Sequence, residues 1–140
     1  MGLRILLIDD HTLFRSGLQG LLAHRNIEVV ASVGDGREGL RCAEELKPDV
    51  VLLDMRMPDI DGIGVLKKLR ESGFHKPIVM LTTSTEERDL VESLRNGAQG
   101  YLLKDMEPDE LVLALRDIVA GKTVVAPDLA PVLAKVVKGD

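Results

Sequence analysis

The sequence has a single cysteine, Cys42, among its 140 residues, so neither an internal disulfide framework nor a cysteine-based zinc site can form. It also lacks any block of lysine and arginine. Its formal net charge of −5 argues against nucleic acid or an anionic membrane as the direct partner of this segment. No apolar stretch is long enough to span a bilayer or to form the core of a signal peptide. We therefore expect a single soluble domain, located in the cytoplasm.

Five short apolar runs alternate with segments that carry apolar residues at helical spacing. The runs lie at residues 5–8, 27–30, 50–53, 78–81 and 101–103. Runs without polar alternation are typical of strands buried on both faces, so they predict a parallel sheet with helices on either side. A (βα)5 alternation of this length predicts a doubly wound α/β fold, whose five-stranded form has the strand order 2-1-3-4-5.

Boundary signals for the helices agree with this alternation. The start signals are two pairs with capping-box spacing and a proline suited to the first helical position: Asp35 with Glu38, Ser84 with Glu87, and Pro108. The stop signals are Asn96-Gly97 and Ala120-Gly121. A weak apolar pattern over residues 127–138 predicts a short added helix or a linker.

Three carboxylates follow two of the predicted strands directly. Asp9 and Asp10 end the first apolar run and Asp54 ends the third. In the order 2-1-3-4-5 these strands are neighbours, so the acids should converge at the carboxyl edge of the sheet. Like charges about 4 Å apart repel by roughly 1 kcal/mol in water and about 4 kcal/mol at an effective dielectric near 20, so the cluster needs a cation. Oxygen ligands favour Mg²⁺, whereas His11 is expected to pack locally because no second imidazole is spaced to help it.

Two further polar groups end the remaining central strands. Thr82 offers a hydroxyl and Lys104 a compact cation to a phosphate oxygen. An aspartate can itself accept a phosphoryl group and form a transient acyl phosphate. Asp54 is the best acceptor candidate because it stands alone after its strand, whereas Asp9 and Asp10 are adjacent and suited to hold a metal ion.

These motifs together resemble the receiver domain of bacterial two-component response regulators. The motifs are Leu-Ile-Asp9-Asp10-His, Leu-Leu-Asp54-Met-Arg-Met-Pro58 followed by Gly62, Leu-Thr82-Thr, and Gly-Tyr101-Leu-Leu-Lys104. The resemblance covers residues 3 to 121 and implies the flavodoxin/CheY-like form of the fold. The segment from Gly100 to Pro108, with Ala130-Pro131-Val-Leu-Ala after it, is similar to the NarL/FixJ group and especially to nitrate/nitrite regulators.

The resemblance implies a role for each residue. Asp54 would accept the phosphoryl group from a sensor kinase histidine, while Asp9, Asp10, Asp54 and the backbone carbonyl of Arg56 would bind Mg²⁺. Thr82 and Lys104 would contact the phosphorylated side chain, and Tyr101 would change rotamer as Thr82 moves. The face made by the fourth helix, fifth strand and fifth helix would then change its partner preference.

One position departs from the family pattern. Many receivers follow the lysine with a proline in a cis peptide, but Asp105 follows Lys104 here, and a cis bond without proline costs about 3 kcal/mol. The sequence leaves the geometry of the Lys104–Asp105 peptide open.

Three interpretations of the whole chain compete. The first is a phosphorylatable receiver, which is not an enzyme beyond Mg²⁺-dependent self-phosphorylation and self-dephosphorylation. The second is a Mg²⁺-dependent phosphatase or phosphotransferase with Asp54 as nucleophile, although the familiar pattern of such enzymes has an acid where Arg56 stands. The third is a receiver-like binding module that takes no phosphate, which would usually lack Lys104 or one of the acids. Nucleotide binding is disfavoured, since neither a Walker loop nor a Gly-x-Gly-x-x-Gly turn follows the first strand.

The resemblance also divides the chain. Residues 1–121 would form the receiver, and residues 122–140 would be a linker or short extra helix towards a helix-turn-helix domain that this chain does not contain. We expect the chain to be the regulatory part of a transcription factor, with a free-standing receiver as the alternative. The expected partner is a sensor histidine kinase; DNA would bind only through the other domain, and homodimerisation on phosphorylation stays open.

Overall fold

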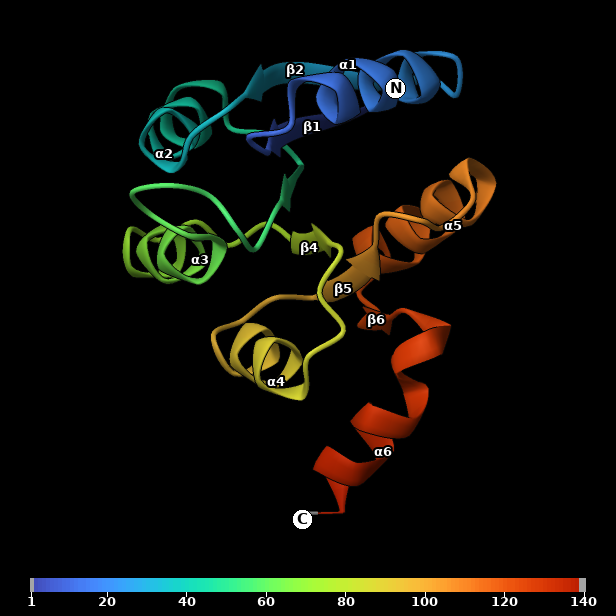
Figure 1. The fold of residues 1–140 in the computed structure, drawn as a ribbon. Helices are drawn as coiled ribbons and strands as arrows, with labels where there is room; N and C mark the ends of the chain where they lie inside the picture. The colour runs from blue at the N-terminus through green and yellow to red at the C-terminus, as the bar shows by residue number, and fades with distance from the viewer. Residues whose placement is uncertain (1, 139–140) are drawn as a thin grey trace.

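The computed structural model describes residues 2–138 as alternating strands and helices built on one parallel sheet (Figure 1). The strands are β1 (Leu3–Ile8), β2 (Ile27–Val33), β3 (Val50–Leu53), β4 (Ile78–Thr82), β5 (Gly100–Leu103) and β6 (Val124–Val125). The helices are α1 (Thr12–Ala23), α2 (Gly36–Leu46), α3 (Gly62–Glu71), α4 (Glu87–Arg95), α5 (Pro108–Val119), the 3-10 turn η1 (Pro127–Leu129) and α6 (Ala130–Val137).

The sheet order is β2-β1-β3-β4-β5-β6, and every neighbouring pair is parallel. The predicted (βα)5 fold and its order 2-1-3-4-5 are therefore confirmed. The sequence did not predict β6, which pairs only two residues, Val124 and Val125, with Gly100 and Tyr101. A strand of two residues is too short to carry a periodic signal of its own, and it is recognised only by its pairing with the edge of β5.

Helices cover both faces of the sheet, as Figure 1 shows with α1 and α5 on one side and α2, α3 and α4 on the other. One core cluster joins the α1 and α5 side chains to alternate strand residues such as Ile5, Leu7 and Leu52. The other joins α2, α3 and α4 to Leu6, Val51 and their neighbours. Residues of β3 are fully buried on both faces. Each such leucine or valine contributes about 1.5–3 kcal/mol through removal from water.

Most helix boundaries follow the predicted signals. The carboxylate of Asp35 accepts a hydrogen bond from the Glu38 backbone N–H at 2.9 Å and caps α2. Pro108 is the first residue of α5, and Gly97 and Gly121 follow α4 and α5 in the left-handed conformation that glycine tolerates. No cis peptide occurs between residues 2 and 138, so Lys104–Asp105 is trans.

The predicted capping box at Ser84 is wrong. Helix α4 begins at Glu87, with Glu86 as the residue before it, and Ser84 lies outside the helix. The Ser84 hydroxyl instead donates to the side chain of Asp89 and accepts from the Glu86 backbone N–H at 3.2 Å. The Ser84 hydroxyl therefore bonds to the side chain of Asp89 and to the N–H of the residue before the helix, and does not act as the cap that the spacing predicts.

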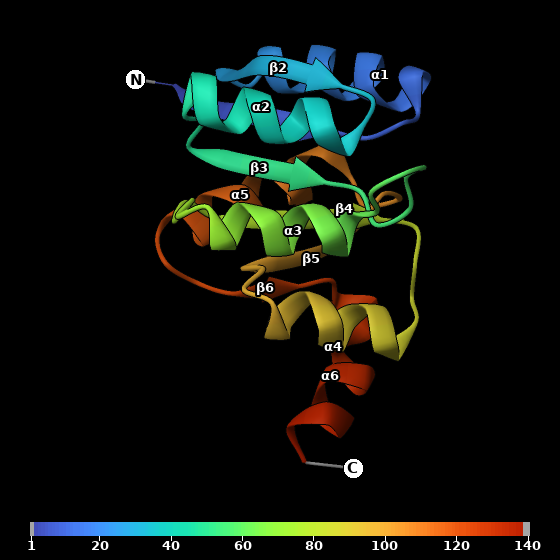
Figure 2. The same ribbon diagram turned by 90° about the vertical axis from the view of Figure 1, so that its left-hand side faces the viewer.

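The segment after α5 packs back onto the domain. Leu129 and Ala126 are buried, and α6 lies beside α4, where Lys135 and Glu87 form an ion pair of 3.4 Å (Figure 2). Within residues 2–138, no helix combines the length and the apolar character that a membrane crossing requires.

Candidate functional site

The carboxyl edge of the sheet brings the predicted acids together. Ile8 of β1 stands opposite Leu53 of β3, so Asp9 and Asp54 follow paired residues, and the Asp54 N–H donates to the Ile8 carbonyl at 3.0 Å. Asp9, Asp10, His11 and Asp54 each offer a ligand atom, and these atoms all lie within 4.8 Å of one another. The convergence expected from the strand order is therefore present.

Lys104 is the cation of this cluster. Its ammonium nitrogen lies 2.7 Å from Asp9 Oδ2 and 3.2 Å from Asp54 Oδ2, and it sits 4.6 Å from the centre of the Phe14 ring. The side chain is only 9% exposed, so little water screens these pairs. Lys104 therefore bridges the two buried carboxylates from the end of β5.

The His11 backbone and side chain both contact the cluster. Its N–H donates to Asp9 Oδ1 at 2.8 Å, which fixes that carboxylate at the start of α1. The ring Nδ1 lies 3.5 Å from Asp9 Oδ1 and 3.3 Å from the Lys104 ammonium, while the side chain is 69% exposed. These contacts are the local polar packing expected of His11, although its ring nitrogen is also within reach of an ion at the cluster.

Asp54 is held in an environment that opposes its charge. Burial and the neighbouring Asp9 charge raise the pKa of the Asp54 carboxyl above 3.8, although Lys104 and a hydrogen bond from the Met55 N–H act the other way. The folded chain therefore binds the Asp54 proton more tightly than the unfolded chain does. Ionisation of Asp54 destabilises the fold until a second cation approaches.

Removal of the Asp54 charge should therefore stabilise the metal-free protein. Because the folded pKa is raised, stability falls as pH rises from the unfolded value towards and past the folded one. We expect Asp54→Asn to raise the free energy of unfolding at pH 7 by about 1 kcal/mol, and this gain should shrink as the pH falls through the raised pKa of Asp54, because the wild-type carboxyl then becomes neutral as well. Urea titrations of both proteins from pH 4 to 8 measure it; a gain that grows in acid would contradict this electrostatic description.

Thr82 and Tyr101 lie deeper, beside the β4–α4 loop. Thr82 is 1% exposed at the end of β4, and its hydroxyl oxygen accepts the Ser84 N–H at 3.1 Å, which leaves its own proton available to an acceptor. The Tyr101 ring is fully buried and its hydroxyl donates to the Ser84 carbonyl at 3.1 Å. Burial raises the pKa of the Tyr101 phenol, so it stays protonated at neutral pH.

Arg56 contributes to the site in two ways. Together with Asp10, Met57, Pro58 and Asp61 it lines a cavity of about 310 Å³ that opens beside the acids. Its guanidinium reaches α4, with Nη2 2.6 Å from Asp89 Oδ2 and 3.0 Å from Glu86 Oε2. The acidic cluster therefore has open space next to Asp10, bordered by the Arg56 loop.

Two residues that support the site were not predicted from the sequence. Arg15 donates to the Asp9 backbone carbonyl and, at 3.1 Å, to the Ser32 hydroxyl, so it ties β1 to β2 directly behind the cluster. Asp89 binds Arg56 and Ser84, and it is only 5% exposed. An acid in the first turn of a helix is ordinarily a solvated helix-dipole partner, so the sequence held no signal for this burial.

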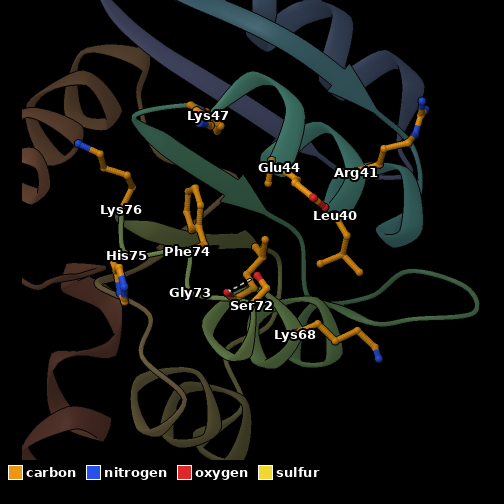
Figure 3. Close-up of a pocket in the computed structure, with 13 residues that line it drawn as sticks. Leu40, Arg41, Glu44, Lys47, Lys68, Ser72, Gly73, Phe74, His75 and Lys76 are labelled. Carbon is orange, nitrogen blue, oxygen red and sulfur yellow. Dashed lines mark hydrogen bonds between the residues drawn. The ribbon is translucent and has the colours of Figure 1, made fainter.

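A larger cavity of about 700 Å³ lies at the opposite edge of the sheet, between the ends of α2 and α3 (Figure 3). Leu40, Leu69 and Phe74 are among the residues that line it, and its lining includes none of the acids of the cluster. Size alone therefore does not identify the reactive site of this domain.

A phosphoacceptor signalling domain is the class of protein that this fold and acidic edge define. Comparison with protein families matches the response regulator receiver domain over residues 5–116. The chain is 46% identical over 131 residues to the nitrate/nitrite response regulator protein NarL of Escherichia coli strain K12, which covers 93% of this chain and 61% of that protein. The chain thus spans less than two thirds of the length of this relative.

Solved structures agree with the sequence comparison. A two-component response regulator of the LuxR family from Aurantimonas sp. SI85-9A1 superposes with a TM-score of 0.90 at 32% identity, covering 96% of this chain and 97% of that one. The signal receiver domain of a response regulator described as NarL from Mycobacterium tuberculosis gives 0.82 at 34% identity, covering 86% and 98%. The chain belongs to the response regulator receiver domain family, as a receiver of the NarL type. The predicted family is confirmed.

Proposed function

We propose that Asp54 accepts a phosphoryl group from a phosphohistidine of a cognate sensor kinase, with Mg²⁺ held at the acidic cluster. The observation that carries this proposal is the convergence of Asp9, Asp10 and Asp54 within 4.8 Å, with Lys104 bridging Asp9 and Asp54. In the transfer, an Asp54 carboxylate oxygen forms a bond to phosphorus as the bond from phosphorus to the histidine nitrogen breaks, and that nitrogen keeps the electron pair.

The contacts of the two buried acids favour Asp54 as the acceptor. Asp9 is engaged through both oxygens, by the His11 N–H at 2.8 Å and by Lys104 at 2.7 Å. Asp54 has the longer contact with Lys104, 3.2 Å, and its other oxygen accepts only the neighbouring Met55 N–H. Asp54 Oδ2 can therefore leave Lys104 for phosphorus, after which the ammonium can contact a phosphoryl oxygen.

Mg²⁺ is the ion that fits the donor set, because carboxylate and carbonyl oxygens suit a hard cation that keeps several waters. We assign Asp9, Asp10, Asp54 and the backbone carbonyl of Arg56 as its ligands. When bound, the ion offsets the negative charge of the acids and of the transferring group. Lys104 alone cannot do this, since its single charge is set against three carboxylates, of which it contacts Asp9 and Asp54.

The readout would pass from Asp54 to the face formed by α4, β5 and α5. The Thr82 hydroxyl has a free proton to donate to a phosphoryl oxygen, and Ser84 links Thr82 to Tyr101 through two hydrogen bonds of 3.1 Å. Movement of Thr82 would therefore shift the loop that packs on Tyr101. The further assignments, also proposals, are a cytoplasmic location, a receiver over residues 1–121, and DNA binding through a separate domain joined by residues 122–140.

Intact-mass measurement tests the acceptor assignment. With Mg²⁺ and a small acyl phosphate the protein is expected to gain one phosphoryl group, and Asp54→Asn should abolish the gain because an amide oxygen is a poor nucleophile. Asp105→Asn, which removes an exposed carboxylate next to Lys104, is the matched control and should label like the wild type. Labelling that persists in Asp54→Asn would refute the assignment.

Thermal melts test the metal assignment through Asp10. Because the three acids repel one another without a metal ion, Asp10→Asn is expected to raise the melting temperature of the metal-free protein modestly, and it should also weaken Mg²⁺ binding. Added Mg²⁺ should then stabilise the wild type more than the variant, so that the difference between their melting temperatures shrinks or changes sign. Parallel shifts of both proteins would show that Asp10 does not bind the ion.

A further inference from the structure

Asp89 joins the loop after β3 to the loop after β4, although it belongs to neither. It lies in the first turn of α4, and its side chain is only 7% exposed. Its Oδ2 accepts from Arg56 Nη2 at 2.6 Å and also from the Ser84 hydroxyl, while its Oδ1 lies 3.4 Å from Arg56 Nη1. A single buried carboxylate thus holds residues that stand two positions after Asp54 and two positions after Thr82.

The Arg56 charge would weaken cation binding if the guanidinium lay beside Asp10. Arg56 lines the same cavity as Asp10, and its side chain is 58% exposed, so a guanidinium without its contacts to α4 would stand beside that cavity and its acid. Asp89 and Glu86 draw the guanidinium towards α4 instead. Of the two, Asp89 is the stronger anchor, because it makes a two-nitrogen contact in a poorly hydrated setting, whereas Glu86 is 63% exposed.

We propose that Asp89 is a positioning residue for the cation site: it keeps the Arg56 charge out of the cavity beside Asp10 and thereby couples cation binding to the order of α4. The proposal rests on the proposed function, because it concerns the same cluster. It adds to that function a residue outside the acidic cluster that sets the cation affinity of the cluster. By linkage, a divalent cation that binds the cluster must in turn stabilise the contact between Arg56 and Asp89.

Calorimetric titration with Mg²⁺ alone, at pH 7, tests the proposal on four proteins. Asp89→Asn releases the Arg56 charge and is expected to raise the dissociation constant for Mg²⁺ about tenfold. Arg56→Gln removes the charge but keeps the backbone carbonyl that would bind the ion, so it serves as the reference for the double variant. The double variant Arg56→Gln/Asp89→Asn should then bind like Arg56→Gln, because no charge is left to be released.

Two rival explanations give different results. If Asp89 acts only as one more negative charge at a distance, Asp89→Asn weakens binding equally in both backgrounds, and the matched control Glu87→Gln in the same helical turn weakens it as well. If Asp89 is only structural, the double variant is no better than Asp89→Asn. Either result overturns the proposal. A wild type that binds no Mg²⁺ would instead refute the proposed function itself.

Two further measurements cover the case in which Asp89→Asn folds poorly. Arg56→Lys keeps the charge but loses the two-nitrogen contact at an exposed position, and we expect it to raise the Mg²⁺ dissociation constant about threefold. Hydrogen exchange of the α4 amides should slow when Mg²⁺ is added to the wild type but not to Arg56→Lys. Unchanged Mg²⁺ affinity in Arg56→Lys, or equal slowing in both proteins, would overturn the coupling.

Discussion

Replacement of Lys104 by methionine is expected to lower the free energy of unfolding by about 3–5 kcal/mol in metal-free buffer at pH 7. Methionine fills the space of the lysine stem beside Phe14 but leaves Asp9 and Asp54 buried without a cation. The loss comes from the two uncompensated carboxylates rather than from a cavity. Urea denaturation of the variant and the wild type measures it.

Two conditions separate this explanation from a packing defect. The loss should shrink in acid, because the raised pKa of the Asp54 carboxyl lets it become neutral there, and in saturating Mg²⁺, which replaces the missing charge. Lys122→Met is the control, because Lys122 is 70% exposed and lies 3.9 Å from Asp117, and it should change stability by no more than about 0.5 kcal/mol. A Lys104→Met loss that is independent of both pH and Mg²⁺ would contradict the electrostatic account.

Gly62→Ala is also expected to destabilise the protein strongly. A Cβ at this position would lie 2.2 Å from the Asp54 carbonyl oxygen and 2.8 Å from the Met55 Cα, both of which are backbone atoms. The backbone cannot yield as a flexible side chain does, so the start of α3 must move away from the loop after β3. We expect a loss of about 3 kcal/mol in the free energy of unfolding, together with slower phosphorylation of Asp54.

Gly20→Ala is the matched control for Gly62→Ala. Gly20 lies within α1, and no atom outside its local helix lies within 4 Å of an added Cβ. Alanine should therefore stabilise the protein by about 0.5–1 kcal/mol, in the opposite direction. A Gly62→Ala variant that is as stable and as readily phosphorylated as the wild type would show that this close approach has no role in shaping the site.

The fold could be predicted because its signals are local and repeated. Apolar runs such as Val50–Leu53 identify strands buried on both faces, and a parallel sheet with helical crossovers then leaves few strand orders. The failures occurred where a distant partner decided the outcome. Ser84 has the spacing of a helix cap but bonds to the buried Asp89, and β6 is defined by its pairing with the edge of β5 rather than by a pattern of its own.

The same distinction holds for the site. Asp9, Asp54 and Lys104 directly follow strands, so strand order alone places them together, and the distances of 2.7 and 3.2 Å agree with that placement. Arg15 and Asp89 are helical residues whose orientation depends on how each helix packs. A linear sequence does not show that an exposed-looking acid will be buried against an arginine 33 residues away.

The position of the phosphoryl group distinguishes Asp54 from the other acids of the cluster as the acceptor. Treatment with a small acyl phosphate in Mg²⁺, followed by borohydride, reduces an aspartyl phosphate to homoserine, which peptide mass spectrometry can locate. We predict homoserine at position 54 and at no other aspartate, with none formed when Mg²⁺ is removed by a chelator. Homoserine at position 9 or 10, or unmodified Asp54 in a protein that has gained phosphate, would contradict the account.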